Sequence, residues 1–168
     1  RMDEAKTVQQ LFDIQLELAQ YGGTGFFSAG LGADDKNATQ NILNVSQGGI
    51  TLGQKEYYLD NDDATKKIRE AYKLHIVRMF QLFGYSKGAS TKKMKNIMDV
   101  ETSLAKVSKS RTELRDPIAN YNKMTLAEFD SKYPHLQLEK LMNAKGIESR
   151  FIQEMVVGQP DFMAAADN

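Results

Sequence analysis

The feature that most constrains the fold is a long apolar stripe with helical spacing between residues 68 and 83. Its apolar members recur every three or four positions, which places them on one side of a helix. The members of the stripe are Ile68, Ala71, Tyr72, His75, Ile76, Met79, Phe80 and Phe83. Asn61, Asp62 and Asp63 offer oxygens that cap a helix start, and Gly84 stands where a left-handed residue ends a helix. We therefore predict a helix that packs one face into a core.

Much of the remaining chain also has helical character. Apolar residues at helical spacing predict helices over residues 4–19 and from about 90 to 108. The first of these carries Val8, Leu11, Phe12, Leu16 and Ala19, and the second carries Met94, Ile97, Met98, Glu101, Leu104 and Ala105 on one side. Three shorter helices are expected near the carboxyl end. Their signals are a capping box of Thr125 and Glu128, a terminating Gly146, and Pro160 at a helix start.

One segment is expected to form strands. Between residues 27 and 33, larger and smaller residues alternate, which is typical of a strand. A polar turn follows at 34–39, and Ile42, Leu43 and Val45 can return as the second strand of a hairpin. The prediction is a mainly α fold, a helical domain with one short β-hairpin near residues 26–47.

Composition limits the classes of protein that the chain can represent. Its 168 residues fit a single domain spanning 1–168, and it contains no cysteine for a disulfide or a thiolate metal site. No apolar run is long enough for a membrane segment, and no signal peptide is recognised.

The charge is zero overall but unevenly placed. Residues 1–63 hold four basic and ten acidic side chains (−6), and residues 64–115 hold thirteen basic and four acidic (+9). The remainder holds five basic and eight acidic (−3). Such a basic middle could bind nucleic acid or an anionic surface. We favour the alternative, in which basic helices face acidic neighbours of the same fold.

The sequence contains no recognisable catalytic motif, so we predict no catalytic, metal or cofactor-binding residue. The His-Glu-x-x-His pattern of zinc peptidases is absent, and the two histidines, His75 and His135, have no second ligand at metal-binding spacing. We expect His75 to be partly buried in the helix stripe and His135 to lie in a loop.

A dense tract at residues 114–125 combines an ion pair, a proline, a Tyr-Asn turn and a helix start. We predict a structural corner in which Asp116 caps backbone amides and Arg115 pairs nearby. In the segment 47–59, Tyr57 and Tyr58 are expected to anchor a loop on the core rather than stack on a ligand. The predicted structural-motif residues are Gln47, Gly49, Tyr57, Tyr58, Arg115, Asp116, Pro117, Tyr121 and Asn122.

Three segments, 32–37 (Gly-Ala-Asp-Asp-Lys-Asn), 47–59 and 114–125, resemble in order and spacing the neprilysin-like zinc metallopeptidases. That family includes neprilysin, the endothelin-converting enzymes and bacterial endopeptidase O. The stretches around Glu101 and at 156–162 are similar to the same family. Two positions depart from the family pattern: Gly53 stands where a proline is usual, and Ile50 replaces a leucine.

The resemblance implies a piece of the N-terminal helical lobe that covers a peptide chamber, inert without the rest of the enzyme. Zinc and the catalytic domain would lie in the parent's remaining chain, which would be this fragment's partner, with peptides as substrates. It further implies a bacterial enzyme located outside the cytoplasm, with no nucleic acid as partner. A dimer through exposed apolar surface is a further expectation. The alternative is a stand-alone helical module whose basic middle binds nucleic acid or a protein.

Overall fold

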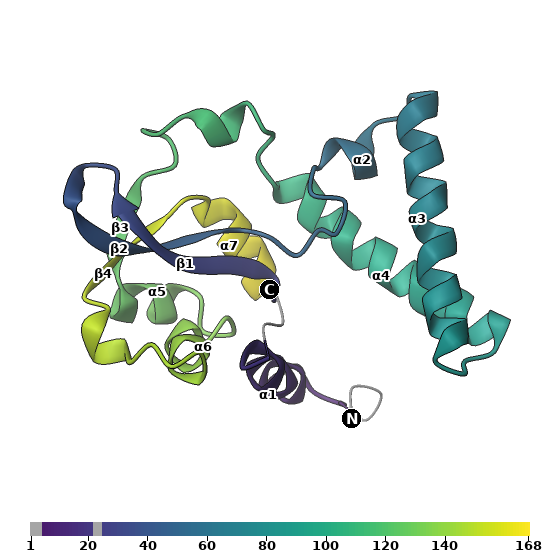
Figure 1. Ribbon diagram of the computed structural model, residues 1–168, viewed down its shortest axis with the longest axis horizontal. Helices are drawn as coiled ribbons and strands as arrows, with labels where there is room; N and C mark the ends of the chain where they lie inside the picture. Colours follow the sequence, from purple (N-terminus) through teal and green to yellow (C-terminus); the bar gives the residue numbers. More distant parts are fainter. Residues whose placement is uncertain (1–4, 22–24) are drawn as a thin grey trace. The chain divides into compact units, whose positions relative to one another are not determined.

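The computed structural model describes residues 5–21 and 25–168, which pack as two compact units. The first unit comprises residues 1–49 and 112–168, and the second comprises residues 50–111. The mainly α fold with a small β region is confirmed (Figure 1). The expectation that both units belong to one domain of a larger lobe stays a prediction.

The first unit is built around a sheet with strand order β1-β2-β4-β3. Its elements are α1 (Val8–Ala19), β1 (Phe27–Asp34), β2 (Asn37–Gln47), η2 (Glu113–Arg115), β3 (Asn122–Thr125), α5 (Leu126–Lys132), α6 (Leu138–Ala144), η3 (Ser149–Phe151), β4 (Glu154–Val157) and α7 (Pro160–Asp167). The predicted hairpin is present: β1 and β2 pair antiparallel, with Phe27 opposite Gln47.

Strands β3 and β4 were not predicted. Strand β4 pairs parallel with β2, where Leu43 lies opposite Met155, and antiparallel with β3, where Met124 lies opposite Met155. These pairings join segments far apart in the chain. A local pattern of only four residues per strand carries little signal for them.

Strand β4 is covered on both faces. Its consecutive residues Met155, Val156 and Val157 are all buried, although neighbouring side chains of a strand point to opposite faces. Helical residues supply the cover, and those with the least exposure are Phe129, Leu138, Met142, Phe162 and Met163. Phe129 also lies beside Tyr133, with ring centroids 4.9 Å apart. The central strands therefore sit in a core between layers of helix.

Most local helix signals of this unit behave as predicted, and the start of α1 is the exception. Thr125 and Glu128 form the complete capping box of α5. Gly146 adopts a φ of 79° after α6, and Pro160 occupies the first turn of α7. Helix α1 begins after the N-cap Thr7 rather than at residue 4. Residues 1–4, the side chain of Val8 and residues 22–24, on which part of the prediction rested, lie outside the described residues.

The second unit consists of α2 (Glu56–Leu59), α3 (Asp63–Leu82) and α4 (Lys87–Val107). Helix α3 starts as predicted, with the Asp62 side chain accepting from the Thr65 amide at 2.9 Å. It ends as predicted at Gly84, whose φ is 92°. Helix α4 begins slightly earlier than expected because Ser86 caps the Ala89 amide at 3.3 Å.

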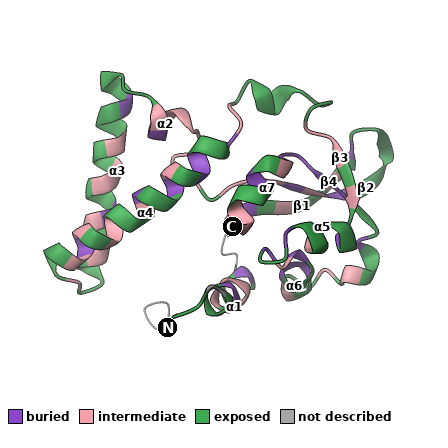
Figure 2. Ribbon diagram, turned by 180° about the vertical axis from the view of Figure 1, so that it is seen from behind, coloured by how far each residue is buried: buried purple, intermediate pink, exposed green. Residues whose placement is uncertain are grey.

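The core of the second unit comprises Tyr58, Ile76, Met98 and Ala105. Much of α3 is exposed (Figure 2), so part of the predicted stripe is wrong. His75 is exposed rather than partly buried, and Phe83 is 76% exposed. The reason is that the main packing partners of α3 are α2 and α4. These two helices cover a narrower face of α3 than the apolar stripe occupies.

No helix within the described part of the chain combines the length and the apolar character that a membrane crossing requires.

Candidate functional site

The corner after η2 is held by side chains that bind the backbone. Asp116 Oδ1 accepts from the amides of Ile118 (2.9 Å) and Ala119 (3.0 Å). Asn120 Nδ2 donates to the carbonyls of Glu113 (2.8 Å) and Asp116 (2.7 Å). Polar atoms that a tight turn leaves without secondary-structure partners are thereby satisfied. The corner is a rigid turn made by its own short side chains.

Gln159 connects this corner to the end of β2. Its side chain is 4% exposed, and its Oε1 accepts from the Gln47 amide at 2.8 Å. Its Nε2 donates to Asn120 Oδ1 at 2.9 Å. Asn122 adds a further bond, from Nδ2 to the carbonyl of Val157 at 2.9 Å. Gln47, the corner at 114–125 and the segment 156–162 therefore meet in the first unit, whereas residues 50–59 belong to the second.

A second set of contacts connects the corner to the hairpin turn. The Tyr121 hydroxyl donates to Asp34 Oδ1 at 2.8 Å, and the Lys36 amide donates to the same oxygen at 2.9 Å. The Lys36 ammonium lies 4.2 Å from the centre of the Tyr121 ring. Lys123 Nζ lies 2.7 Å from Glu154 Oε2 and 3.9 Å from Asp34 Oδ2. The Lys36 amide and then the Tyr121 hydroxyl hold the pKa of Asp34 below its usual value.

The second unit contains a buried carboxylate. Glu101 is 7% exposed, and its Oε1 accepts from the hydroxyls of Thr51 (2.6 Å) and Tyr72 (2.9 Å). Its Oε2 accepts from the Tyr58 hydroxyl at 2.7 Å, and that hydroxyl oxygen accepts from the Leu52 amide at 3.0 Å. Within the described residues no cation pairs with Glu101. Three neutral donors therefore compensate for removing its charge from water.

Burial also affects the two tyrosines. It raises the pKa of Tyr72 to about 12, and the nearby Glu101 carboxylate adds to the rise. The pKa of Tyr58 is raised in the same way, first by burial and then by its hydrogen bond to Glu101. Both hydroxyls therefore keep their protons and remain donors to the carboxylate at neutral pH.

The segment 50–59 is thus anchored on α3 and α4. Tyr58 is buried, whereas Tyr57 packs partly against the core and accepts from Arg69 Nε through its carbonyl at 2.9 Å. Gly53 adopts a φ of 76°, and its amide donates to the carbonyl of Ile50 at 3.1 Å. A proline, the usual residue of the family pattern, has a φ near −65° and no amide proton. The turn at Gly53 therefore differs from the one that a proline would form.

The structure distributes the predicted motif residues over both units. Gln47, Tyr121 and Asn122 take part in the network of the first unit, where Gly49 has a φ of 72°. Arg115 and Pro117 are exposed in the corner. The pairing of Arg115 with a nearby carboxylate stays a prediction.

The sequence did not predict the hydrogen bonds that Asp34, Asn120, Gln159 and Glu101 form in these networks. For Glu101 a signal was present, because a lone carboxylate on the apolar side of a helix needs hydrogen-bond donors. For Gln159 no local signal exists, since its partners Gln47 and Asn120 are distant in sequence.

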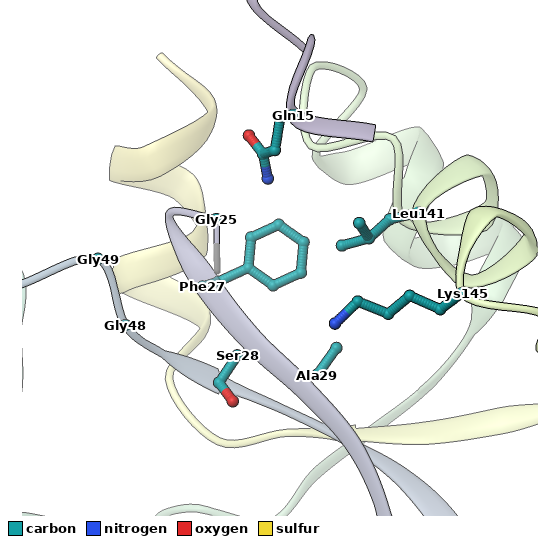
Figure 3. Close-up of a pocket in the computed structure, with 9 residues that line it drawn as sticks. All are labelled: Gln15, Gly25, Phe27, Ser28, Ala29, Gly48, Gly49, Leu141 and Lys145. Atoms are coloured by element: carbon teal, nitrogen blue, oxygen red, sulfur yellow. The ribbon is translucent and has the colours of Figure 1, made fainter. Parts of the chain in front are cut away.

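A cavity of about 230 Å³ lies beside β1 in the first unit (Figure 3). Its lining residues are Gln15, Gly25, Phe27, Ser28, Ala29, Gly48, Gly49, Leu141 and Lys145. Figure 3 shows the Phe27 ring at its centre, with the Lys145 amine near Ala29 and the Gln15 amide on the opposite side. The lining combines apolar groups with one ammonium (Lys145), one amide (Gln15) and one hydroxyl (Ser28).

The residues that the structure describes do not fit a zinc site. Within the described ranges no three residues of the types His, Cys, Asp and Glu come together to hold a metal ion. His75 is exposed on α3. His135 lies in the turn between α5 and α6, where its Nδ1 is 2.9 Å from the carbonyl oxygen of Asp167 and 3.3 Å from Asp167 Oδ2.

The chain is similar to known proteins over most of its length. The N-terminal model of peptidase family M13 matches residues 1–168. Endothelin-converting enzyme-like 1 of Rattus norvegicus is 32% identical over 125 residues, which cover 73% of this chain and 16% of that protein. Endothelin-converting enzyme 1 of Homo sapiens is 31% identical over 131 residues, or 77% of this chain and 17% of that protein.

Solved structures agree. The zinc metalloprotease Zmp1 of Mycobacterium tuberculosis, in complex with an inhibitor, superposes with a TM-score of 0.88 at 27% identity, over 98% of this chain and 25% of that one. PepO from Lactobacillus rhamnosis has the same fold, with a TM-score of 0.75 at 17% identity over 96% of this chain and 25% of that one. The chain thus spans about a quarter of these structures and about a sixth of the curated relatives. It belongs to the neprilysin-like peptidase family M13 and corresponds to part of its N-terminal region.

Proposed function

We propose that this chain is part of the helical lobe that covers the substrate chamber of a bacterial zinc metalloendopeptidase, and that it does not cut peptides alone. One observation carries the proposal. The motifs that resemble the family, at 32–37, 47–59 and 114–125, hold turns and loops in place. Their polar groups bind backbone atoms, one another or a buried carboxylate. Such residues maintain a shape and supply no nucleophile, general base or metal ligand.

In the parent enzyme, zinc and the catalytic residues would lie in a domain outside this chain, and that domain would be its partner. The covering lobe would limit access to peptides and would help to orient them. We also infer a location outside the cytoplasm, as a periplasmic, secreted or membrane-anchored enzyme. The endothelin-converting enzymes to which the chain is similar support the choice of peptides as substrates.

The first test is a peptidase assay of the purified chain with added zinc. We expect no turnover and no bound zinc by elemental analysis. Turnover that persists through repurification and disappears on mutation of residues in this chain would refute the proposal.

The second test addresses access to the chamber in the parent enzyme. Tyr121→Phe removes the hydroxyl that connects the corner to Asp34. If the lobe limits access, this variant should raise kcat/KM for a long unfolded chain relative to a short fluorogenic peptide. Ile118→Ala, at an 84% exposed side chain of the same corner, is the matched control. An unchanged ratio for both variants would argue against an access role.

The positive charge of the second unit favours a second candidate function, the binding of nucleic acid. The second unit, residues 50–111, holds thirteen basic and seven acidic side chains, a net charge of +6. Lys92 and Lys95 on α4 are exposed, whereas Lys93 lies 4.6 Å from the centre of the Tyr85 ring. A binding module for nucleic acid would bind strongly at low salt and lose affinity steeply as salt rises. The Lys92→Ala/Lys95→Ala variant should then reduce that slope; weak, salt-insensitive binding would exclude this function.

The proposed dimer is tested separately. Helix α3 exposes the large apolar side chains of Leu74 (70%) and Leu82 (77%), and Phe83, which follows the helix, is 76% exposed. Sedimentation velocity over a range of concentrations should show a monomer–dimer equilibrium that Leu82→Lys shifts towards monomer. A single monomeric species at all concentrations would remove this expectation.

A further inference from the structure

The two edges of the sheet differ in how well they are protected. Strand β3 is 4 residues long, and Lys123 on it pairs with Glu154 of the neighbouring strand. The Thr125 amide at its end is bound by Glu128 Oε2 at 2.7 Å. A short edge with charge and a bound amide resists pairing with further strands. This edge is therefore closed to strand addition.

Strand β1, at the other edge, has none of these features. It is 8 residues long, and no charged residue precedes Asp34 at its end. Leu31 in its middle is 62% exposed. A Cβ built on Gly30 would meet no atom within 4 Å, so the face of the strand opposite Leu31 is open at this position. Within the described residues, β2 is its only strand neighbour, so alternate amides and carbonyls along its outer edge have no strand partner.

The cavity of about 230 Å³ lies at the start of this strand, where Phe27 and Ala29 meet Gly48 and Gly49 after β2 and Lys145 at the end of α6. It is smaller than the roughly 300–1,000 Å³ of sites that hold drug-sized molecules, and so it suits one side chain. Phe27 and Ala29 line it, and Leu31 follows on the same side because side chains alternate along a strand. An edge strand with a side-chain cavity next to it is the arrangement that binds extended peptides by strand addition.

Lys145 adds a charge preference. Figure 3 shows its amine near Ala29 at the cavity. In the part of the chain that the structure describes, this amine has no ion-pair partner. A carboxylate would complement it. Phe27 and Ala29 are two residues apart on one face of β1, and Lys145 lies near Ala29. An apolar ligand side chain beside Phe27 and an acidic one beside Ala29 would therefore also be two residues apart.

We propose that the outer edge of β1 binds an extended peptide as an additional strand, with an apolar side chain in the cavity and an acidic side chain two positions away on Lys145. The inference rests on the geometry of the first unit alone and does not depend on the covering role proposed above. The occupant is a separate peptide with this apolar-x-acidic pattern.

The test uses a fluorescein-labelled peptide, Thr-Val-Leu-Thr-Glu-Val-Thr, and fluorescence polarisation with the whole chain. Two N-methylated versions of the peptide are compared. One carries methyl groups on every second backbone amide, and the other carries them on the remaining amides. In an added strand one set of amides faces β1 and the other faces away. One version should therefore lose about tenfold or more in affinity while the other binds like the parent peptide.

Protein variants test the charge preference. Lys145→Glu should weaken the glutamate peptide by about threefold to fivefold and should favour a peptide with lysine in its place. Lys140→Glu, on the same helix at an exposed position outside the cavity lining, is the matched control and should leave both affinities unchanged. The comparison of N-methylated peptides needs no protein variant, so it remains decisive if one fails to fold.

Absence of saturable binding, or equal loss for both N-methylated peptides, would overturn the proposal. So would a concentration-dependent dimer that Leu31→Lys dissociates while the monomer binds no peptide, because the edge would then pair with a second copy.

Discussion

Glu101→Gln is the most informative change in the second unit. It keeps the shape of the side chain but replaces one acceptor oxygen with a donor. If the amide oxygen takes the place of Oε1, it can still accept from Thr51 and Tyr72. The new NH₂ group then faces the Tyr58 hydroxyl, which already accepts from the Leu52 amide. The Tyr58 proton is left without its acceptor in a buried site.

The expected cost follows from these contacts. One charge-assisted hydrogen bond is lost and one buried donor is unsatisfied, which together lower the free energy of unfolding by about 1–3 kcal/mol. The bonds that remain, to Thr51 and Tyr72, also weaken because their acceptor is now neutral. Asp99→Asn, at an exposed carboxylate of the same helix, should change stability by less than about 0.5 kcal/mol.

Urea denaturation followed by circular dichroism measures the loss, and native-state hydrogen exchange locates it. The Leu52 amide should exchange faster in Glu101→Gln, because its acceptor, Tyr58, is no longer fixed. A double-mutant cycle with Tyr58→Phe should show a coupling of about 0.5–3 kcal/mol, since the two side chains share one hydrogen bond.

A loss below about 0.5 kcal/mol for Glu101→Gln, with unchanged exchange at Leu52, would refute the reasoning. It would mean that the three hydroxyls find other partners and that the carboxylate does not anchor the segment 50–59.

Three further outcomes are expected. Because burial raises the pKa of Tyr72 from 10.0 to about 12, the folded state keeps a proton that the unfolded chain loses, so stability should fall as pH rises from 10 to about 12. Tyr72→Phe should make this decline shallower, and an identical pH profile would contradict the assignment. Phe80→Ala should destabilise by about 2–3 kcal/mol in urea denaturation, less than the 3–5 kcal/mol of a fully buried ring, because Phe80 is half-buried against the core; a loss under roughly 1 kcal/mol would exclude that contact. Gly53→Pro should lower stability by about 3 kcal/mol or more, since φ is 76° and the amide is bonded, whereas the control Gly88→Ala, with open space on α4, should be neutral or slightly stabilising. Equal melting temperatures for the two glycine variants would show that the turn tolerates proline.

The interactions that were predicted well are local. The Asp62 cap, Gly84, the capping box of Thr125 with Glu128, and Pro160 each act within one helical turn. Their partners are fixed by sequence spacing, so the chemistry of a few neighbouring residues was sufficient to place these helix ends.

The candidate site was only partly accessible to the same reasoning. The corner at Asp116 could be predicted because its acceptor binds amides two and three residues away. The bond from Tyr121 to Asp34 spans 87 residues, and that from Gln47 to Gln159 spans 112. No local pattern encodes such pairs, although the resemblance of the segments to one family indicated that they matter.

By itself, the sequence determined the helical character, the hairpin, several of the helix ends and the family. Only the tertiary structure decided that Asn122–Thr125 and Glu154–Val157 join the hairpin as strands, that α3 exposes His75, and that Glu101 is buried among three hydroxyls. The physical reason is that helix ends and turns depend on atoms a few residues apart, whereas strand pairing and burial depend on which distant segments arrive at the same place.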